Sequence, residues 1–335
     1  MTRQICLIGY FEKNLGDDLL FKAFIENTSF SEYIIPRNKT IGVSIEKDVR
    51  TPTLLERKIG FFNPRDIALI GGSLFIETEE KPLFDLKKRL IKKLAKNKKR
   101  GCKNYIIGCN LGPIFFEESY KETIKYISKL IEFWTVRDDF SYQLLKELAH
   151  CRVIKAPDLV HSLEFKVPEL EKKSKKMAVI SIVDFEYQTS FTQQKNSAEY
   201  YASLLAWHSF FESEGYQVVY ASFEDSVDVP AFHKYIGKGE IALNQGDEIS
   251  SLISNSDIVL CSRFHALILA ASMGKSVIPF AYSNKMKCYL EDLGHVPTSI
   301  SAPPSWDGKI DLNLPEDTQK QALEHLQELR ADSSL

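Results

Sequence analysis

The chain has 335 residues, 44% of them hydrophobic and 26% charged, and its formal net charge is −2. This length and composition are typical of a soluble globular protein with room for two domains. The near-neutral charge gives no electrostatic case for a nucleic-acid partner, and no apolar run approaches the ~20 residues of a membrane span.

Cysteine use and the first residues indicate a compartment. The six cysteines are scattered, and no two have the spacing of a metal site or of a CxxC motif. We therefore expect reduced thiols in a cytoplasmic protein, with no metal site. The amino terminus, MTRQICLIGYF, turns polar too soon for a signal peptide.

In the first half of the chain, short β-rich runs alternate with longer helical patterns, which predicts parallel βαβ units. Strands are expected at 4–10, 67–72, 104–110, 133–138 and 152–158. Helices are expected at 17–27, 84–99, 119–131 and 139–149. The stretch 167–176 is polar and charged and carries a proline, so it is interpreted as a linker.

The second half repeats the alternation. Strands are expected at 177–185, 216–222, 257–261 and 276–281, and helices near 197–214, 229–237, 247–255, 264–273, 284–293 and 315–331. We therefore expect an α/β fold with two Rossmann-like domains facing across a cleft. The predicted N-terminal domain is 1–166, the C-terminal domain is 177–310, and 311–335 is a terminal helix and tail.

Ligands of such sheets bind beyond the carboxyl ends of the strands, which directs attention to the loops there. After the first strand, Asn14 and Gly16 suit a tight turn, Asp17 can cap the following helix, and Asp18 adds charge favoured at its start. The same residues would also suit a loop that holds sugar hydroxyls. The sequence alone leaves both interpretations open.

The next strand ends are rich in glycine. Gly71, Gly72 and Ser73 follow the second strand and Gly112 follows the third, so a ligand would be able to approach the backbone closely. No GxGxxG or P-loop spacing is present, which argues against a dinucleotide or ATP. Arg137, at the end of the fourth strand, is a further substrate-binding candidate, although pairing with a nearby carboxylate explains it more readily.

Two adjacent strand-to-helix junctions of the second domain carry cations. Ser262, Arg263 and His265 precede or open one helix, and Ser283, Asn284 and Lys285 stand at the next. Free helix amides and cations together favour a phosphate-sized anion, and the imidazole adds a group that can move a proton. The helix dipole disfavours protonation of His265.

The segment 85–103 is strongly basic. It carries ten Lys and Arg residues from Lys87 to Lys103 and no acid after Asp85. Leu86, Leu90, Ile91 and Leu94 are expected to line its inner face. A solvated face on a core helix is the preferred interpretation, and peripheral contact with an anionic membrane is the alternative.

Six motifs occur in order, and the similarity that they carry spans roughly residues 5–294: NLGDDLLF, IGGSLF, GCNLGPI, VRDDFSYQLLKEL, APDLVHSL and SRFHALILAASMGKSVIPFAYSNKMKCYLEDLG. With these motifs the chain resembles the polysaccharide pyruvyl transferases, and the last block is the most specific. The resemblance implies a fold like that of the two-domain GT-B glycosyltransferases. It also implies transfer of the enolpyruvyl group of phosphoenolpyruvate to two hydroxyls of a sugar, which releases phosphate and leaves a pyruvate ketal.

The resemblance implies that His265 is catalytic and that Arg263 binds the donor, on the C-terminal side of the cleft. Asp17 or Asp18 would then orient or deprotonate an acceptor hydroxyl on the N-terminal side. The acceptor would be a sugar of a cell-surface polysaccharide precursor, with a lipid-linked oligosaccharide as one option, handled in the cytoplasm or at the inner face of the membrane. Phosphoenolpyruvate is a co-substrate, and no cofactor is expected.

Two departures from the family pattern stand out. Ser73 replaces a frequent third glycine, and Asp184 stands at the end of a strand where an arginine is often found. An acid there would repel a trianionic donor, so either another cation takes over or the donor differs. The main alternative is a GT-B glycosyltransferase with a nucleotide-sugar donor, and a second is a non-catalytic carbohydrate-binding scaffold.

Overall fold

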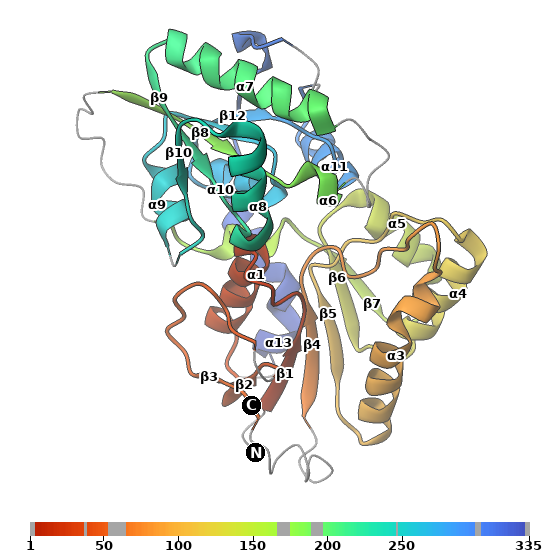
Figure 1. Cartoon of the computed structure of the whole chain (residues 1–335). Coiled ribbons are helices and arrows are strands. Elements are labelled where there is room, and N and C mark those ends of the chain that lie inside the picture. The colour runs from red at the N-terminus through yellow and green to blue at the C-terminus, as the bar shows by residue number, and fades with distance from the viewer. Residues whose placement is uncertain are drawn as a thin grey trace.

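The structure, a computed structural model, describes residues 4–36, 39–52, 65–165, 175–188, 197–245, 247–298 and 303–331. Two α/β domains follow each other along the chain (Figure 1). Each holds one β-sheet with helices on both faces, which confirms the expected fold class. The expected linker, 167–176, lies almost wholly outside the described residues.

The first sheet has seven strands in the order β3-β2-β1-β4-β5-β6-β7, and every described pairing is parallel. The strands are β1 Gln4–Ile8, β2 Glu32–Ile34, β3 Val49–Arg50, β4 Asp66–Ile70, β5 Asn104–Ile107, β6 Phe133–Val136 and β7 Arg152–Lys155. The sequence did not predict β2 and β3, because two or three residues are too few for a recognisable period.

The helices of this domain are α1 Leu15–Glu26, α3 Leu83–Lys99, α4 Glu117–Ser128 and α5 Asp139–Leu148, with the short 3₁₀ helix η1 Leu159–Ser162. The strands are buried on both faces, and β4 shows why. Ala68 and Ile70 pack in the cluster that includes α1, whereas Ile67 and Leu69 pack with α3 and α4. Successive side chains of a strand point to opposite faces, so an almost continuous apolar run is needed here.

The second sheet has the order β10-β9-β8-β11-β12-β13, parallel except for β13 against β12. Its strands are β8 Lys176–Ser181, β9 Tyr216–Ala221, β10 Glu240–Ala242, β11 Ile258–Cys261, β12 Ser276–Pro279 and β13 Ile310–Asp311. Its helices are α6 Phe185–Gln188, α7 Ser197–Ser213, α8 Asp225–Ala231, the π-helical η2 Phe232–Ile236, α9 Glu248–Ser254, α10 Phe264–Ser272, α11 Asn284–Asp292 and η3 Trp306–Gly308. The short strands β10 and β13 were also not predicted.

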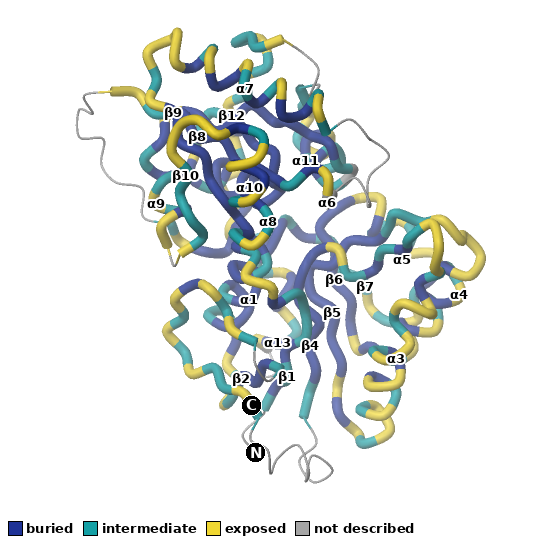
Figure 2. The backbone as a smooth tube through the Cα atoms, in the orientation of Figure 1, coloured by how far each residue is buried: buried dark blue, intermediate teal, exposed yellow. Residues whose placement is uncertain are grey.

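The domains share a core where they meet. One apolar cluster runs from α1 and η1 of the first domain into α10 of the second, and Figure 2 shows the sheets and α10 as buried backbone. The last elements, α12 Thr318–Ala322, η4 Leu323–Leu326 and α13 Gln327–Ala331, return to the first domain. There His325 bonds the Thr135 hydroxyl at 2.6 Å and the Pro157 carbonyl at 2.8 Å. Within the described ranges, none of the helices combines the length and the apolar character needed to cross a membrane.

Candidate active site

His265 lies where the two domains touch. It is the second residue of α10, after Arg263 at the N-cap, and only 8% of its surface is exposed. The imidazole rests on Gly16, in the first turn of α1: a Cβ atom built there would lie 1.8 Å from Nδ1 of His265. Only glycine admits this contact. The amino ends of α1 and α10, each carrying partial positive charge, therefore face the same point.

The environment of His265 keeps its imidazole neutral. The pKa of His265 is lowered to about 3, chiefly by burial; Asp158 opposes this shift, and Arg137 and Lys285 contribute to it. Nε2 of His265 is buried and has no hydrogen-bond partner among the described residues, and the nearest of their carboxylate oxygens, Oδ2 of Asp158, is 3.9 Å away. Burial is the largest of the causes that lower this pKa. The ring can accept a proton if a bound anion offsets this cost.

Arg137 is held beside the imidazole by side chains of its own domain. Its Nη1 donates to Asp158 in a buried ion pair, and its Nη2 donates to Oδ1 of Asn110 at 2.8 Å. The guanidinium lies 4.4 Å from the ring centroid of Phe264, and a Cβ atom on Gly72 would lie 2.3 Å from Nη2. Asp158 is therefore the carboxylate that the sequence led us to expect next to Arg137.

Asp17 of the first domain and Lys285 of the second lie close to each other and to Arg137. Burial raises the pKa of Asp17 to about 6, although Lys285 and Arg137 lower it. Burial and the charge of Arg137 lower the pKa of Lys285 to about 8, while Asp17 raises it. Lys285 Nζ lies 5.7 Å from the Phe264 ring centroid. Gly71, at a φ of +119° that favours glycine, makes room for the carboxylate, since a Cβ atom there would lie 3.2 Å from Oδ1 of Asp17.

The helix start at α1 differs from the expected one. Asn14, not Asp17, is the N-cap: its side-chain oxygen accepts from the Gly16 amide at 3.1 Å. The Asn14 amide group also donates to Glu224 of the second domain at 3.1 Å, and the Tyr10 hydroxyl donates to the other oxygen of Glu224 at 3.1 Å. Asn14 therefore ties the first helix to the opposite domain.

Asp18 does not join this group. Its carboxylate is fully buried, and neither oxygen has a hydrogen-bond partner among the described residues. Burial raises the pKa of Asp18 to about 7, opposed by the nearby amide of Gly42. A protonated carboxylic acid is the form this site favours at and below neutral pH.

Arg263 points toward the second domain's own interior. Its Nη2 donates to Asp228 in a buried ion pair, and its Nε donates to the Ile182 carbonyl at 3.3 Å. Burial acts against its charge, but Asp228 prevails and raises the pKa of Arg263. The amides of Ser262 and Arg263 donate to the Ser181 hydroxyl at 2.8 and 3.1 Å.

The remaining residues that the sequence predicted as substrate-binding take less part in the site around His265. Ser283 is the N-cap of α11 but makes no side-chain capping bond, and its buried hydroxyl has no partner among the described residues. Asn284 is the first residue of α11, and its side chain is not among those that the structure describes. Ser73 is exposed, and the Gly112 amide donates to the Phe75 carbonyl and the Tyr120 hydroxyl. No hydrogen bond or ion pair of the described residues joins Ser73 or Gly112 to His265.

Sequence reasoning missed several members of the site: Asn110, Asp158, Glu224, Asp228 and Phe264. Asp158 and Asn110 stand in the motifs APDLVHSL and GCNLGPI, so the signal was present for both. Glu224 and Asp228 had no such signal. Across the described ranges, no group of His, Cys, Asp or Glu is arranged to hold a metal ion.

The fold and this site define a two-domain α/β protein of the GT-B type, with cations and a buried histidine at the domain junction. The chain belongs to the polysaccharide pyruvyl transferase family, whose profile matches residues 14–284. The protein is therefore assigned to polysaccharide biosynthesis, as a transferase. Comparison with curated protein sequences gave no match.

Solved structures share the fold at low sequence identity. UDP-N-acetylglucosamine 2-epimerase from Rickettsia bellii is 10% identical with a TM-score of 0.59, covering 100% of this chain and 96% of its own. HepE from Anabaena, solved with UDP and glucose, is 9% identical with a TM-score of 0.59, covering 100% and 98%. MnaA of S. aureus, solved with UDP, is 13% identical with a TM-score of 0.56, covering 100% and 91%. These likenesses concern the fold alone.

Proposed function

We propose that the protein transfers the enolpyruvyl group of phosphoenolpyruvate to a sugar of a cell-surface polysaccharide precursor, forming a pyruvate ketal and releasing phosphate. The observation that carries the proposal is the buried, unpartnered Nε2 of His265, set among Arg137, Lys285 and the amino ends of two helices. Family membership supports the class of reaction, and the donor and the ketal are the proposal.

A compact trianion suits this environment. Lys285 and Arg137 both lie over the Phe264 ring, and both lower the pKa of His265. The two cations therefore repel each other and would repel a protonated imidazole. An anion bound between them would relieve this repulsion and favour protonation of the imidazole. Asp184 would repel the donor, and the two cations are the groups that would take the place of the absent arginine. Arg263 would reach the donor only in competition with Asp228.

The reaction needs one proton delivered and two removed. His265 would protonate the methylene carbon of the enol, which makes C2 electrophilic. A sugar hydroxyl would attack C2, and phosphate would leave with its bridging oxygen. The second hydroxyl would then close the ketal. Of the two hydroxyl protons, one restores His265 and the other leaves with phosphate. Asp17, whose pKa is raised to about 6, would relay one of these hydroxyl protons from the N-terminal side.

The test is phosphate release from phosphoenolpyruvate by the full chain, with a panel of lipid-linked and nucleotide-linked sugars as acceptors. We expect release that depends on both substrates and a product heavier than the acceptor by one pyruvate less one water, measured by mass spectrometry. Release without any acceptor adduct would contradict ketal formation. Glycosyl transfer from a nucleotide-sugar, with no use of phosphoenolpyruvate, would overturn the proposal in favour of the glycosyltransferase alternative.

A further inference from the structure

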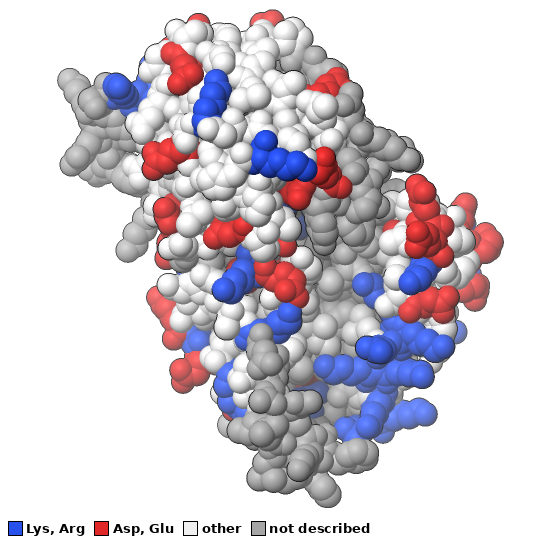
Figure 3. Space-filling model, in the orientation of Figure 1, with Lys and Arg blue, Asp and Glu red and all other residues white. Residues whose placement is uncertain are grey.

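Helix α3 presents a basic surface on the outer side of the first domain. Figure 3 shows Lys and Arg side chains gathered there with few acids among them. Lys88, Arg89 and Lys92 are exposed and have no acidic partner among the described residues. Together they give α3 an outward stripe of unpaired positive charge.

Exposed apolar side chains lie beside this basic surface, at the starts of three neighbouring helices. Leu86 was expected to face inward but is 38% exposed. We define the apolar rim as five residues that share this unusual exposure: Phe84, Leu86, Phe115, Phe116 and Phe140. Helices α3, α4 and α5 follow β4, β5 and β6, so the rim lies at the carboxyl edge of the sheet, the edge that carries the candidate site.

A buried carboxylate holds this rim in place. Glu77, only 1% exposed, accepts from the Leu83 amide at 2.7 Å and from the amides of Phe115 and Phe116 at 2.8 Å each. One carboxylate thus anchors the amino ends of both α3 and α4, and it fixes the backbone that carries three exposed phenylalanines. Large apolar side chains presented on a fixed backbone are typical of a contact surface.

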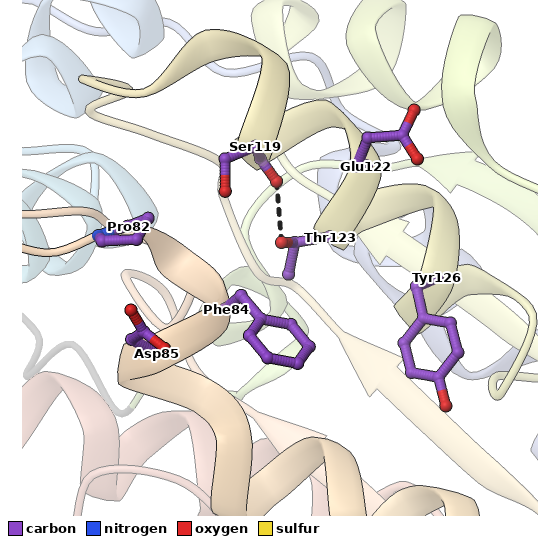
Figure 4. A pocket seen from close by; sticks show the side chains of 7 residues that line it. All are labelled: Pro82, Phe84, Asp85, Ser119, Glu122, Thr123 and Tyr126. Carbon is purple, nitrogen blue, oxygen red and sulfur yellow. Dashed lines mark hydrogen bonds between the residues drawn. The ribbon is translucent and has the colours of Figure 1, made fainter.

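Between α3 and α4 the surface is hollowed into an open groove. Its lining combines apolar and polar side chains (Figure 4): Pro82, Phe84, Asp85, Ser119, Glu122, Thr123 and Tyr126. Two acids of α4 have lysine partners within the helix, because Lys121 lies 2.5 Å from Glu117 and Lys125 lies 3.4 Å from Glu122. Helix α4 carries three acids and two lysines, whereas α3 carries eight Lys and Arg residues and one acid, so the two helices together are strongly positive.

We propose that this face docks on the surface of an anionic lipid bilayer. Phosphate and carboxylate headgroups would meet Lys88, Arg89 and Lys92, while the phenylalanines of the apolar rim would enter the interface between headgroups and acyl chains. Phe84, Lys88 and Lys92 follow one another at four-residue spacing, so apolar and basic contacts share one side of α3. Docking would place the carboxyl edge of the first sheet beside the membrane, and it does not depend on the proposed reaction.

The test uses the full chain without substrates, in flotation with vesicles of phosphatidylcholine alone and with vesicles that also contain phosphatidylglycerol, at low and high salt. We expect binding to the anionic vesicles only, weakened by salt. The triple variant Lys88→Gln, Arg89→Gln, Lys92→Gln should lower the partition coefficient about a hundredfold. Phe115→Ser with Phe116→Ser should weaken binding and leave its salt dependence in place.

The matched control is Lys175→Gln, Lys176→Gln, Lys238→Gln, which removes the same charge from exposed positions of the second domain and should bind as the parent does. Equal thermal unfolding of all variants establishes that they are folded. Parent-like binding by the triple α3 variant, no preference for anionic vesicles, or retention of nucleic acid without vesicle binding would each overturn the proposal.

Discussion

Two buried arginine–aspartate pairs lie on opposite sides of the domain junction, Arg137–Asp158 in the first domain and Arg263–Asp228 in the second. Each aspartate also accepts backbone amides, Asp158 from Val160 at 2.9 Å and Asp228 from Phe223 and Glu224 at 3.0 Å each. The pairs differ in their remaining neighbour. Asp158 lies 3.9 Å from His265, whereas Asp228 accepts backbone amides of the loop before α8 and, at 3.3 Å, the amide of Asp184.

Because of this difference, the first pair acts on the candidate catalytic histidine, whereas the second pair stabilises the fold. Although burial raises it, the charge of Arg137 and the nearby histidines hold the pKa of Asp158 well below its ordinary value, so a fixed negative charge stands beside the imidazole. The second pair stabilises the segment that carries Glu224, and through Asn14 the contact between domains. The same two residue types therefore act on the imidazole in one domain and on the backbone in the other.

The largest expected effect is that of His265, which borders only the first pair. His265→Ala should lower kcat by about 10²–10⁴-fold, the usual contribution of a general acid–base group, with a much smaller change in donor binding. Phosphate release and calorimetric binding of phosphoenolpyruvate measure the two quantities. The control is His208→Gln, a buried histidine of the second domain bonded to Tyr220, which should keep turnover. Near-parent turnover of His265→Ala would refute the role assigned to it.

Replacing each aspartate by asparagine tests the comparison directly. Both changes leave a buried arginine without its counter-charge, so each should lower the free energy of unfolding by about 3–5 kcal/mol. Only Asp158→Asn should also shift the pH dependence of kcat, because the negative charge of Asp158 raises the pKa of His265. Chemical denaturation and pH–rate profiles give the two results. A shifted profile for Asp228→Asn would show that the second pair also acts on the reaction.

The pH dependence of kcat/KM should follow Asp17 and Lys285. Asp17 must lose its proton to act as a base, so activity should rise through about pH 6; Lys285 must keep its proton to bind the donor, so activity should fall through about pH 8. Lys285→Arg should remove the alkaline decline, and Asp17→Asn should lower activity and remove the acid one. If the variants keep both the acid and the alkaline decline of kcat/KM, other groups than Asp17 and Lys285 cause these declines.

The smallest effect concerns Asp18, the buried acid outside the site. Its folded pKa, about 7, is raised above the ordinary 3.8, so its contribution to stability is fully present below about pH 4 and is lost as pH rises toward 7. Asp18→Asn should therefore increase the free energy of unfolding at pH 8 by about 1–2 kcal/mol, with little effect near pH 4. Denaturation at both pH values measures it. Equal effects at the two values would mean that the carboxylate finds a partner in solution.

Local pattern was enough to predict most of the sheets and the two cationic junctions. Strands β1, β4, β8 and β11 stand in apolar runs between turn residues, and Arg263 and His265 stand at the start of α10 as expected. These features depend on residues close together in the chain. The contact of Gly16 with His265 and the bond from Asn14 to Glu224 join residues more than two hundred positions apart, so they depend on how the domains pack.

Asp17 and Asp18 show the limit of the sequence most plainly. The sequence by itself determined that two carboxylates stand in the first turn of a helix, after a strand end and a tight turn. It could not distinguish them, because they are adjacent and identical in type. Successive residues of a helix point about 100° apart, so one side chain faces the domain junction and the other the interior. Packing of α1 against α10 and of Gly42 over Asp18 decided which is which, and with it which carboxylate stands beside Lys285.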